Sequence, residues 1–129
     1  MSSPVETSMS SSLGTTFVQA IANQDASALK ACFADDVQLR ALIPGGLRER
    51  VGAFDSAALI ASWFADSTEL NVAEWSAQDV GDRFHIWYRV VGVEEGHPYV
   101  VEQHLFCVLT DGRISRAHLL CSGFRPRDD

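Results

Sequence analysis

Two stretches near the C-terminal end, YVVEQHLFCVL at 99–109 and RISRAHLLCSGF at 113–124, decide the fold of this 129-residue chain. Thr110-Asp111-Gly112 separates them, and an Asp-Gly pair between two apolar runs is typical of a β-hairpin. A strand with one hydrated face alternates apolar and polar residues, but here both alternating faces are largely apolar or could be buried. We therefore expect two paired strands in a sheet that helices cover on one side and a second subunit covers on the other.

The chain before this hairpin shows helical patterns first and strand patterns later. Leu13, Phe17 and Ile21 recur at four-residue spacing, and Asp25 and Asp55 are typical N-caps of a second and a third helix. A strand is predicted at 37–43, with a short extended piece near 48–51 that could pair back on it. Turn signals divide the remainder into four strands, at roughly 69–79, 83–93, 99–109 and 113–123. The order α-α-β-α-β-β-β-β predicts an α+β domain with an antiparallel or mixed sheet.

Length and composition exclude several classes of protein. We expect one domain over residues 13–127, preceded by a serine-rich tail at 1–12 that is too poor in apolar residues to be ordered. The net charge of -7, spread along the chain, disfavours a nucleic-acid partner. No apolar run approaches the length that crosses a membrane, and the first residues do not resemble a secretory signal. A soluble, cytoplasmic protein is expected.

Neither a cofactor nor a metal is expected. Cys32, Cys107 and Cys121 show no CxxC spacing and lie among apolar residues, which suits a reducing compartment. The sequence contains no HxH or HExxH motif and no phosphate-binding glycine loop. His104 and His118 could face each other across the hairpin, but two histidines without a third ligand make a poor metal site, so a structural pair at a subunit interface is favoured.

Three short motifs carry a resemblance to a known superfamily. They are Ala22-Asn23-Gln24-Asp25 between the first helices, Phe33-Ala34-Asp35-Asp36-Val37 before the first strand, and Asp111-Gly112-Arg113-Ile114 in the last hairpin. In order and spacing the chain resembles the nuclear transport factor 2-like superfamily, which includes SnoaL-like polyketide cyclases, ketosteroid isomerases and limonene epoxide hydrolases. The resemblance implies a cone, in which a curved sheet wraps around the N-terminal helices, with a pocket for a small molecule. It does not imply one activity.

The catalytic positions of these relatives carry no suitable side chain here. The tyrosine of the ketosteroid isomerases corresponds to Phe17, their proton-shuttling aspartate to Ala41 or its neighbour, and their oxyanion acid to Gln103. The acid on the last strand of the cyclases and epoxide hydrolases corresponds to about Leu119. The resemblance therefore leaves enzyme activity undecided and weakens each of these mechanisms.

The register of the last hairpin determines which residues face the pocket. A three-residue loop with Gly112 left-handed would place His104 opposite His118 and would group on the pocket face Gln103, Leu105, Cys107, Ser115, Ala117, Leu119 and Cys121. A dimer interface would then lie on the outer face, at His104, Phe106, Arg116, His118 and Leu120. A two-residue Asp111-Gly112 turn would instead place Glu102 and His104 in the pocket, where they could act as acid or base.

These considerations lead to three hypotheses. The first is a dimeric protein that binds a mostly apolar small molecule, with ligand contacts expected from Phe17, Phe33, Ala41, Trp63, Gln103, Leu105, Ala117 and Leu119. The second is a SnoaL-like cyclase, isomerase or hydrolase that uses Glu102 or His104 as acid or base on a polycyclic or terpenoid substrate. The third is a non-catalytic dimeric interaction module whose own side chains fill the cavity.

Overall fold

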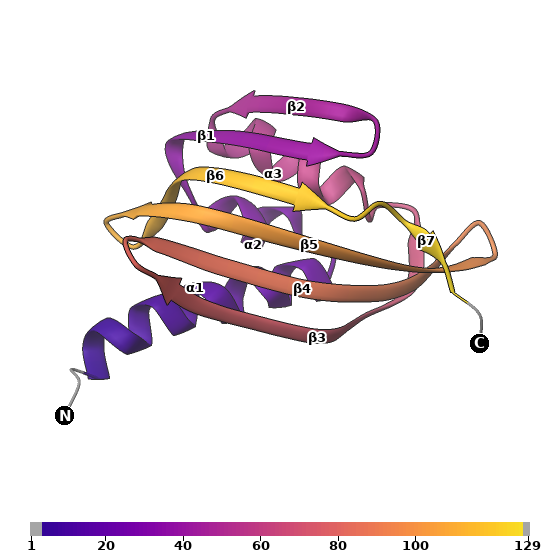
Figure 1. The fold of residues 1–129 in the computed structure, drawn as a ribbon, viewed down its shortest axis with the longest axis horizontal. Helices are drawn as coiled ribbons and strands as arrows, with labels where there is room; N and C mark the ends of the chain where they lie inside the picture. Colours follow the sequence, from indigo (N-terminus) through magenta and orange to yellow (C-terminus); the bar gives the residue numbers. More distant parts are fainter. Residues whose placement is uncertain (1–3, 128–129) are drawn as a thin grey trace.

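The computed structural model describes residues 4–127, with side chains from Ser12 onward (Figure 1). Its elements are α1 (Pro4–Ala22), α2 (Ala26–Ala31), β1 (Phe33–Ile43), β2 (Gly46–Val51), α3 (Ala53–Ser62), β3 (Ser67–Val80), β4 (Arg83–Glu94), β5 (His97–Thr110), β6 (Arg113–Cys121) and β7 (Arg125–Pro126). The predicted α+β order is confirmed, with β2 as the short returning strand and β7 as an addition. None of the described helices is both long and apolar enough to span a bilayer.

The helix starts agree with the sequence at α2 and differ at the other two helices. Asp25 caps α2, since its carboxylate accepts a hydrogen bond from the Ala28 N–H at 3.0 Å. The predicted N-cap at Asp55 is wrong: Gly52 occupies the cap position of α3, and Asp55 lies in the first turn, where a carboxylate favours the positive end of the helix dipole. Helix α1 begins at Pro4, before the predicted start near Leu13. The mobility of residues 1–12 stays a prediction, and residues 1–3 lie outside the described residues.

The sheet is mixed and the helices cover one of its faces. Its strand order is β2-β1-β6-β5-β4-β3, with β7 paired to β5. Strands β1 and β6 are parallel, and the other pairs are antiparallel. Figure 1 looks onto the outer face of the sheet, with the three helices behind it. Register shifts in β1, β3 and β6 are β-bulges or irregularities of the kind that bend and twist a sheet.

The last hairpin combines a short turn with a bulge. Thr110 pairs with Arg113, so the loop contains only Asp111 and Gly112, and both have positive φ angles (53° and 78°), as a type I′ turn requires. The register then shifts between Val108 and Leu109. The Ser115 hydroxyl, which lies at this bulge, donates a hydrogen bond to the Val108 carbonyl at 3.1 Å. The predicted three-residue loop is therefore wrong.

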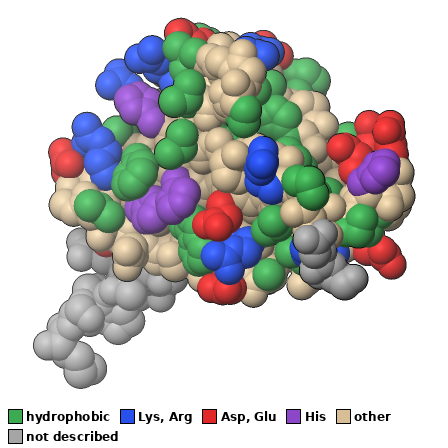
Figure 2. Space-filling model, turned by 45° about the vertical axis from the view of Figure 1, so that its right-hand side comes forward, with side chains coloured by type: hydrophobic (Ala, Val, Ile, Leu, Met, Phe, Trp, Pro, Cys, Tyr) green, Lys and Arg blue, Asp and Glu red, His purple; other side chains and the backbone are tan. Residues whose placement is uncertain are grey.

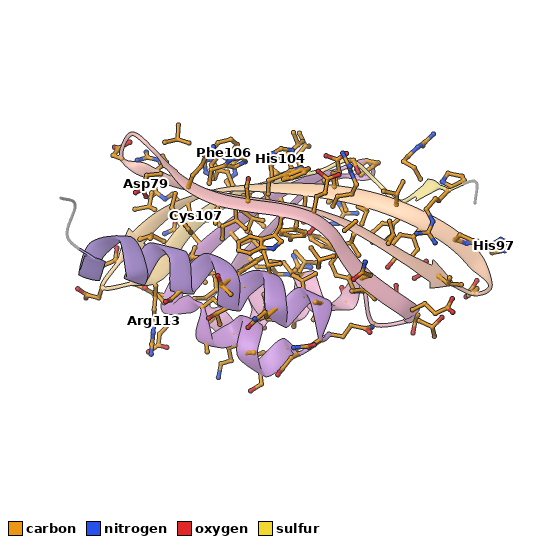
Figure 3. All side chains as sticks on the ribbon, turned by 90° about the horizontal axis from the view of Figure 1, so that it is seen from below. Asp79, His97, His104, Phe106, Cys107 and Arg113 are labelled. Atoms are coloured by element: carbon orange, nitrogen blue, oxygen red, sulfur yellow. The ribbon has the colours of Figure 1, made fainter. Side chains whose placement is uncertain are left out.

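The bulge changes the facing partners but restores the predicted faces. His104 lies opposite Leu120, and His118 lies opposite Phe106, so the predicted His104–His118 pair is wrong. The inner face nevertheless carries buried Gln103, Leu105, Cys107, Ala117, Leu119 and Cys121. Figure 3 shows Cys107 on the helix side of the sheet, with His104 and Phe106 on the other side. The loop is one residue shorter than predicted, which by itself would exchange the two faces of β6. The extra residue at the bulge exchanges them again, so the side chains beyond it return to the predicted faces.

The core lies between the helices and the inner face of the sheet. Phe17 of α1 packs edge-on against Phe33, with ring centroids 6.1 Å apart, and against Tyr88 of β4 at 6.0 Å. Helix α1 approaches β3 so closely that a Cβ atom added at Gly14 would lie 2.4 Å from the Ala77 Cβ. Glycine at this position therefore permits the contact between helix and strand.

Candidate functional site

The residues predicted to contact a ligand mostly form the packed core. Phe17, Phe33 and Gln103 are at most 1% exposed. The remaining buried members of the predicted set, none more than 3% exposed, are Ala41, Leu105, Ala117 and Leu119. Trp63 differs, because it is partly exposed and lies directly after α3. Most of the predicted contact residues are therefore buried in the core, where their own side chains fill much of the space between them.

A buried polar chain crosses the inner face of the sheet from β4 to β6. The Tyr88 hydroxyl donates to the Gln103 Oε1 at 2.5 Å, and the Gln103 Nε2 donates to the Cys121 Sγ at 3.5 Å. The Gly123 N–H also donates to this sulfur, at 3.4 Å. Burial raises the pKa of Tyr88 well above its usual value, with smaller contributions from the nearby Cys121 and Cys107. Tyr88 therefore stays protonated and holds the Gln103 amide in one orientation.

Tyr88 is a site residue that the sequence analysis did not single out. A usable sequence signal is the Glu95-Gly96 pair in the turn between β4 and β5, and both residues have positive φ angles in the structure. Read as a two-residue turn, this pair places Glu94 opposite His97 and, counted back along both strands, Tyr88 opposite Gln103, as the structure shows. The register of this turn would have identified the partner of the buried amide.

An apolar cavity of about 220 Å³ opens at the end of this polar chain. It is lined by Ile43, Pro44, Trp63, Cys121, Gly123 and Phe124. Because β1 and β6 are parallel, both end at the same side of the sheet, at the right in Figure 1, near the C-terminal end of α3. Of the predicted ligand contacts, Trp63 lines this cavity. Cys121, which the predicted hairpin placed on the pocket face, lines it as well.

Aromatic packing and one glycine shape the wall of this cavity. The Phe124 ring packs against Tyr99, with centroids 4.8 Å apart, and against Phe64 at 5.7 Å. Gly123 has a φ angle of +85°, and a Cβ atom there would lie 2.7 Å from the Pro44 Cγ. A residue with a side chain would therefore be strained and would push against the lining. The cavity depends on glycine at this position.

The two candidate catalytic residues, Glu102 and His104, lie on the outer face, so the sheet separates both from the interior. Glu102 accepts a hydrogen bond from the Trp87 indole N–H at 2.9 Å and pairs with Arg89 at 3.3 Å. The indole hydrogen bond is the main cause that lowers the pKa of Glu102, and the Arg89 charge adds to it. Glu102 is therefore an ionised, partnered group.

His104 pairs with His85 of the neighbouring strand β4. The His85 Nε2 and the His104 Nδ1 are 3.0 Å apart, and the rings are stacked with an interplanar angle of 10°. His85 also stacks on Phe106, at a centroid distance of 4.5 Å. Partial burial and then the charge of His104 lower the pKa of His85. One ring must donate and the other accept in this contact, so at least one of the two rings is neutral.

The residues predicted for a dimer interface lie on this same outer face. Phe106 and Leu120 are 45% and 52% exposed, which is unusual for large apolar side chains on the face of a sheet. Arg116 and His118 are exposed beside them, and His104 is partly buried. A shallow depression of about 180 Å³ lies next to His118, between Arg40, Leu42 and Leu47. Figure 2 shows hydrophobic, histidine and charged side chains mixed over this part of the surface.

The cysteines are free, buried thiols. Burial raises the pKa of Cys32 to about 11 and that of Cys107 to about 12, so both carry their proton at neutral pH. Among the side chains of residues 12–127, no three from His, Cys, Asp or Glu gather in a way that could hold a metal ion.

Comparisons with solved structures show which folds this chain shares. A provisionally assigned polyketide cyclase from Xanthomonas campestris matches with a TM-score of 0.68 and 22% identity, over 87% of this chain and 89% of that one. A provisionally assigned isomerase from Bacillus subtilis matches with a TM-score of 0.75 and 14% identity, over 91% and 88%. An epoxide hydrolase from M. tuberculosis, described as LEH-like, matches with a TM-score of 0.64 and 15% identity, over 89% and 84%.

Comparison at the sequence level identifies the family. No functionally curated protein is similar enough to count as a match. The family model of the SnoaL-like domain matches residues 15–117, which include most of the helices and strands described above. The chain therefore belongs to the SnoaL-like domain family, and its arrangement of helices and sheet is the fold of a solved nuclear transport factor 2-like protein.

Proposed function

We propose that this SnoaL-like domain binds a mostly apolar small molecule, and that the binding site is the cavity at the ends of β1 and β6. The observation that carries the proposal is a preformed space of about 220 Å³ with apolar walls and one buried polar chain that reaches its edge at Cys121. Ligand sites in proteins are typically concave, largely apolar and supplied with a few oriented polar groups. The three free cysteines are consistent with the cytoplasmic location expected from the sequence.

Binding without strong acid or base catalysis is favoured over the enzyme alternative. Ala41, Gln103 and Leu119 provide no carboxyl group at the positions where similar proteins place an acid, and Phe17 provides no hydroxyl group where the ketosteroid isomerases place a tyrosine. Glu102 and His104 lie outside the interior and have partners on the outer face. Structural neighbours described as cyclase, isomerase and epoxide hydrolase share the fold at under 25% identity, so they do not supply an activity for this chain.

The binding proposal can be tested by plugging the cavity. Ile43 is partly buried in its wall, and Ile43→Trp should fill it. The matched control is Leu42→Trp, one residue earlier in β1, where the side chain is 51% exposed and points to the opposite face. Native mass spectrometry and NMR titration with 1-tetralone should show binding to the wild type and to the control, and at least tenfold weaker binding to Ile43→Trp. Equal binding by all three proteins would place the site elsewhere and reject the proposal.

The expected partner is a second copy of this chain, seated on the outer face. Phe106 and Leu120 would be buried in such a contact, next to the stacked His85 and His104 rings. Light scattering over a range of protein concentrations should show a dimer for the wild type and a monomer for Phe106→Glu. Val80→Glu changes another exposed apolar residue, on the edge strand β3, and should remain dimeric. A wild-type protein that stays monomeric at high concentration would contradict this part.

A further inference from the structure

We propose that the occupant of the cavity is an uncharged, largely hydrocarbon molecule with one or two rings, and that molecules of three or more rings bind more weakly. This inference rests on the proposed function and narrows the ligand class. It also departs from the sequence-based expectation, which allowed a polycyclic ligand. Size, rigidity and polarity of the cavity each support it.

The size of the cavity sets the first limit. A volume of about 220 Å³ is larger than the roughly 150 Å³ of a protein cavity that binds benzene, and smaller than the roughly 300–1,000 Å³ of pockets for drug-sized ligands. One ring therefore fits with space to spare, and two fused rings fill it. Because the cavity is open to solvent on one side, the further rings of a four-ring skeleton would have to remain in water at this opening or extend into the interior of the domain.

The interior cannot easily provide that additional space. Behind Cys121 the inner face is occupied by Gln103, Tyr88 and Phe17, all fully buried. Gln103 is held by hydrogen bonds on both of its polar ends, and Phe17 and Tyr88 are in ring contact. A larger ligand that extended inward would have to displace the phenol or break its hydrogen bond to the amide, which would leave a buried polar group without a partner. The polar chain thus forms a rigid end of the cavity.

The lining also selects against charge. Its contacting side chains are apolar except for Cys121, whose sulfur already accepts hydrogen bonds from the Gln103 amide and the Gly123 N–H. The thiol hydrogen remains available as a weak donor to one acceptor, such as a ketone oxygen. A carboxylate or ammonium group placed inside the cavity would lose its water without gaining an ionic partner. Trp63 and the braced Phe124 ring instead offer flat aromatic surfaces.

A series of ketones with increasing ring number tests the inference. Cyclohexanone, 1-tetralone and 9-fluorenone each carry one carbonyl group, and they have one, two and three rings, respectively. NMR titration should show binding of the first two to the wild-type protein, with 1-tetralone the tighter. Binding of 9-fluorenone should be at least tenfold weaker than that of 1-tetralone. The charged two-ring probe 2-naphthoate should also bind at least tenfold more weakly.

Enlarging the cavity should shift its preference towards larger ligands. Trp63→Ala removes the largest lining side chain and should raise the affinity for 9-fluorenone at least tenfold, whereas Trp75→Ala, at an exposed tryptophan of β3, should leave it unchanged. If Trp63→Ala fails to fold, Ile43→Ala provides a smaller enlargement with the same expected direction. Cys121→Val should weaken the preference for 1-tetralone over its carbonyl-free analogue tetralin.

The outcomes separate this inference from the proposed function. Equal binding of 1-tetralone and 9-fluorenone to the wild type, with both lost in Ile43→Trp, would overturn the size limit and leave the binding site in place. Tight binding of 2-naphthoate that is lost in the same variant would overturn the charge limit. Failure of every probe to bind, or binding that Ile43→Trp does not affect, would reject the cavity as the site and the inference with it.

Discussion

The two faces of strands β4, β5 and β6 are built from alternating residues of the same strands, yet they treat polar groups differently. On the inner face, Tyr88 and Gln103 are fully buried and hydrogen-bonded to each other. On the outer face, Glu102 bonds to Trp87 and Arg89 while remaining in contact with water. Polar side chains on the inner face therefore need a hydrogen-bond partner within the protein. Those on the outer face can replace a lost partner with water.

The largest difference between the faces is expected for apolar truncations at adjacent positions. Leu105→Ala removes a side chain that is fully buried, and should lower the free energy of unfolding by about 2–5 kcal/mol through lost burial and the cavity left behind. Phe106→Ala removes a half-exposed ring stacked on His85, and should cost about 1 kcal/mol in the monomer. Urea unfolding at several protein concentrations separates these values from association. Similar losses of unfolding free energy in Leu105→Ala and Phe106→Ala would contradict the assignment of these residues to opposite faces.

The next largest effect concerns the buried hydrogen bond. Tyr88→Phe leaves the Gln103 carbonyl without its donor in a dry environment, which should cost about 1–3 kcal/mol. A double-mutant cycle with Gln103→Leu should show strong coupling, because the second change removes the group that the first leaves unpaired. Denaturant unfolding of the four proteins measures it. Additive losses would mean that the two side chains act independently.

A smaller effect is expected for the carboxylate on the outer face. Glu102→Gln should cost less than about 1 kcal/mol at neutral pH, since the ion pair is exposed and water replaces it. The folded-state pKa of Glu102 lies below its ordinary value, so its stabilisation is present above about pH 4.5 and is lost as the pH falls through the folded pKa. Unfolding free energies at several pH values should show the difference between wild type and variant shrinking below that pH. A difference that grows on acidification would contradict this direction.

The smallest effect should come from the histidine pair. The folded-state pKa of His85 is lowered, so below about pH 6.5 the unfolded chain binds a proton more readily than the folded one. The free energy of unfolding should therefore fall slightly from pH 7.5 to pH 5.5, and His85→Phe should reduce that fall while keeping a ring on Phe106. His97→Asn, at the β4–β5 turn, is the control. A wild-type fall that His85→Phe leaves unchanged would show that another group causes it.

The last hairpin shows which features local sequence patterns can predict and which they cannot. Alternation along β5 and β6 correctly predicted the buried set that includes Gln103 and Leu119, because side chains of a strand alternate between faces whatever the loop. The loop length and the His104–His118 pair were wrong. Type I′ geometry at Asp111-Gly112 and the bulge at Ser115 offset each other, and a bulge leaves little trace in a pattern of apolar residues.

The candidate site was less accessible to prediction than the fold. Phe17 and Phe33 were expected at a ligand and instead contact each other in the core, since ring packing depends on how α1 seats against the sheet. Trp63, also expected at a ligand, lies in the wall of the cavity. Its neighbours Pro44 and Phe124 were not expected at a cavity, because they lie in connecting segments whose apolar residues follow no helical or strand periodicity.

By itself, the sequence determined the order of helices and strands, the family and the division of β5 and β6 into two faces, because these follow from short-range periodicity and from motifs read along the chain. The cavity, the contact of Tyr88 with Gln103 and the pairing of His85 with His104 were decided by the tertiary structure alone. The physical reason is that each joins segments distant in sequence, whose meeting depends on register, bulges and helix packing across the whole domain.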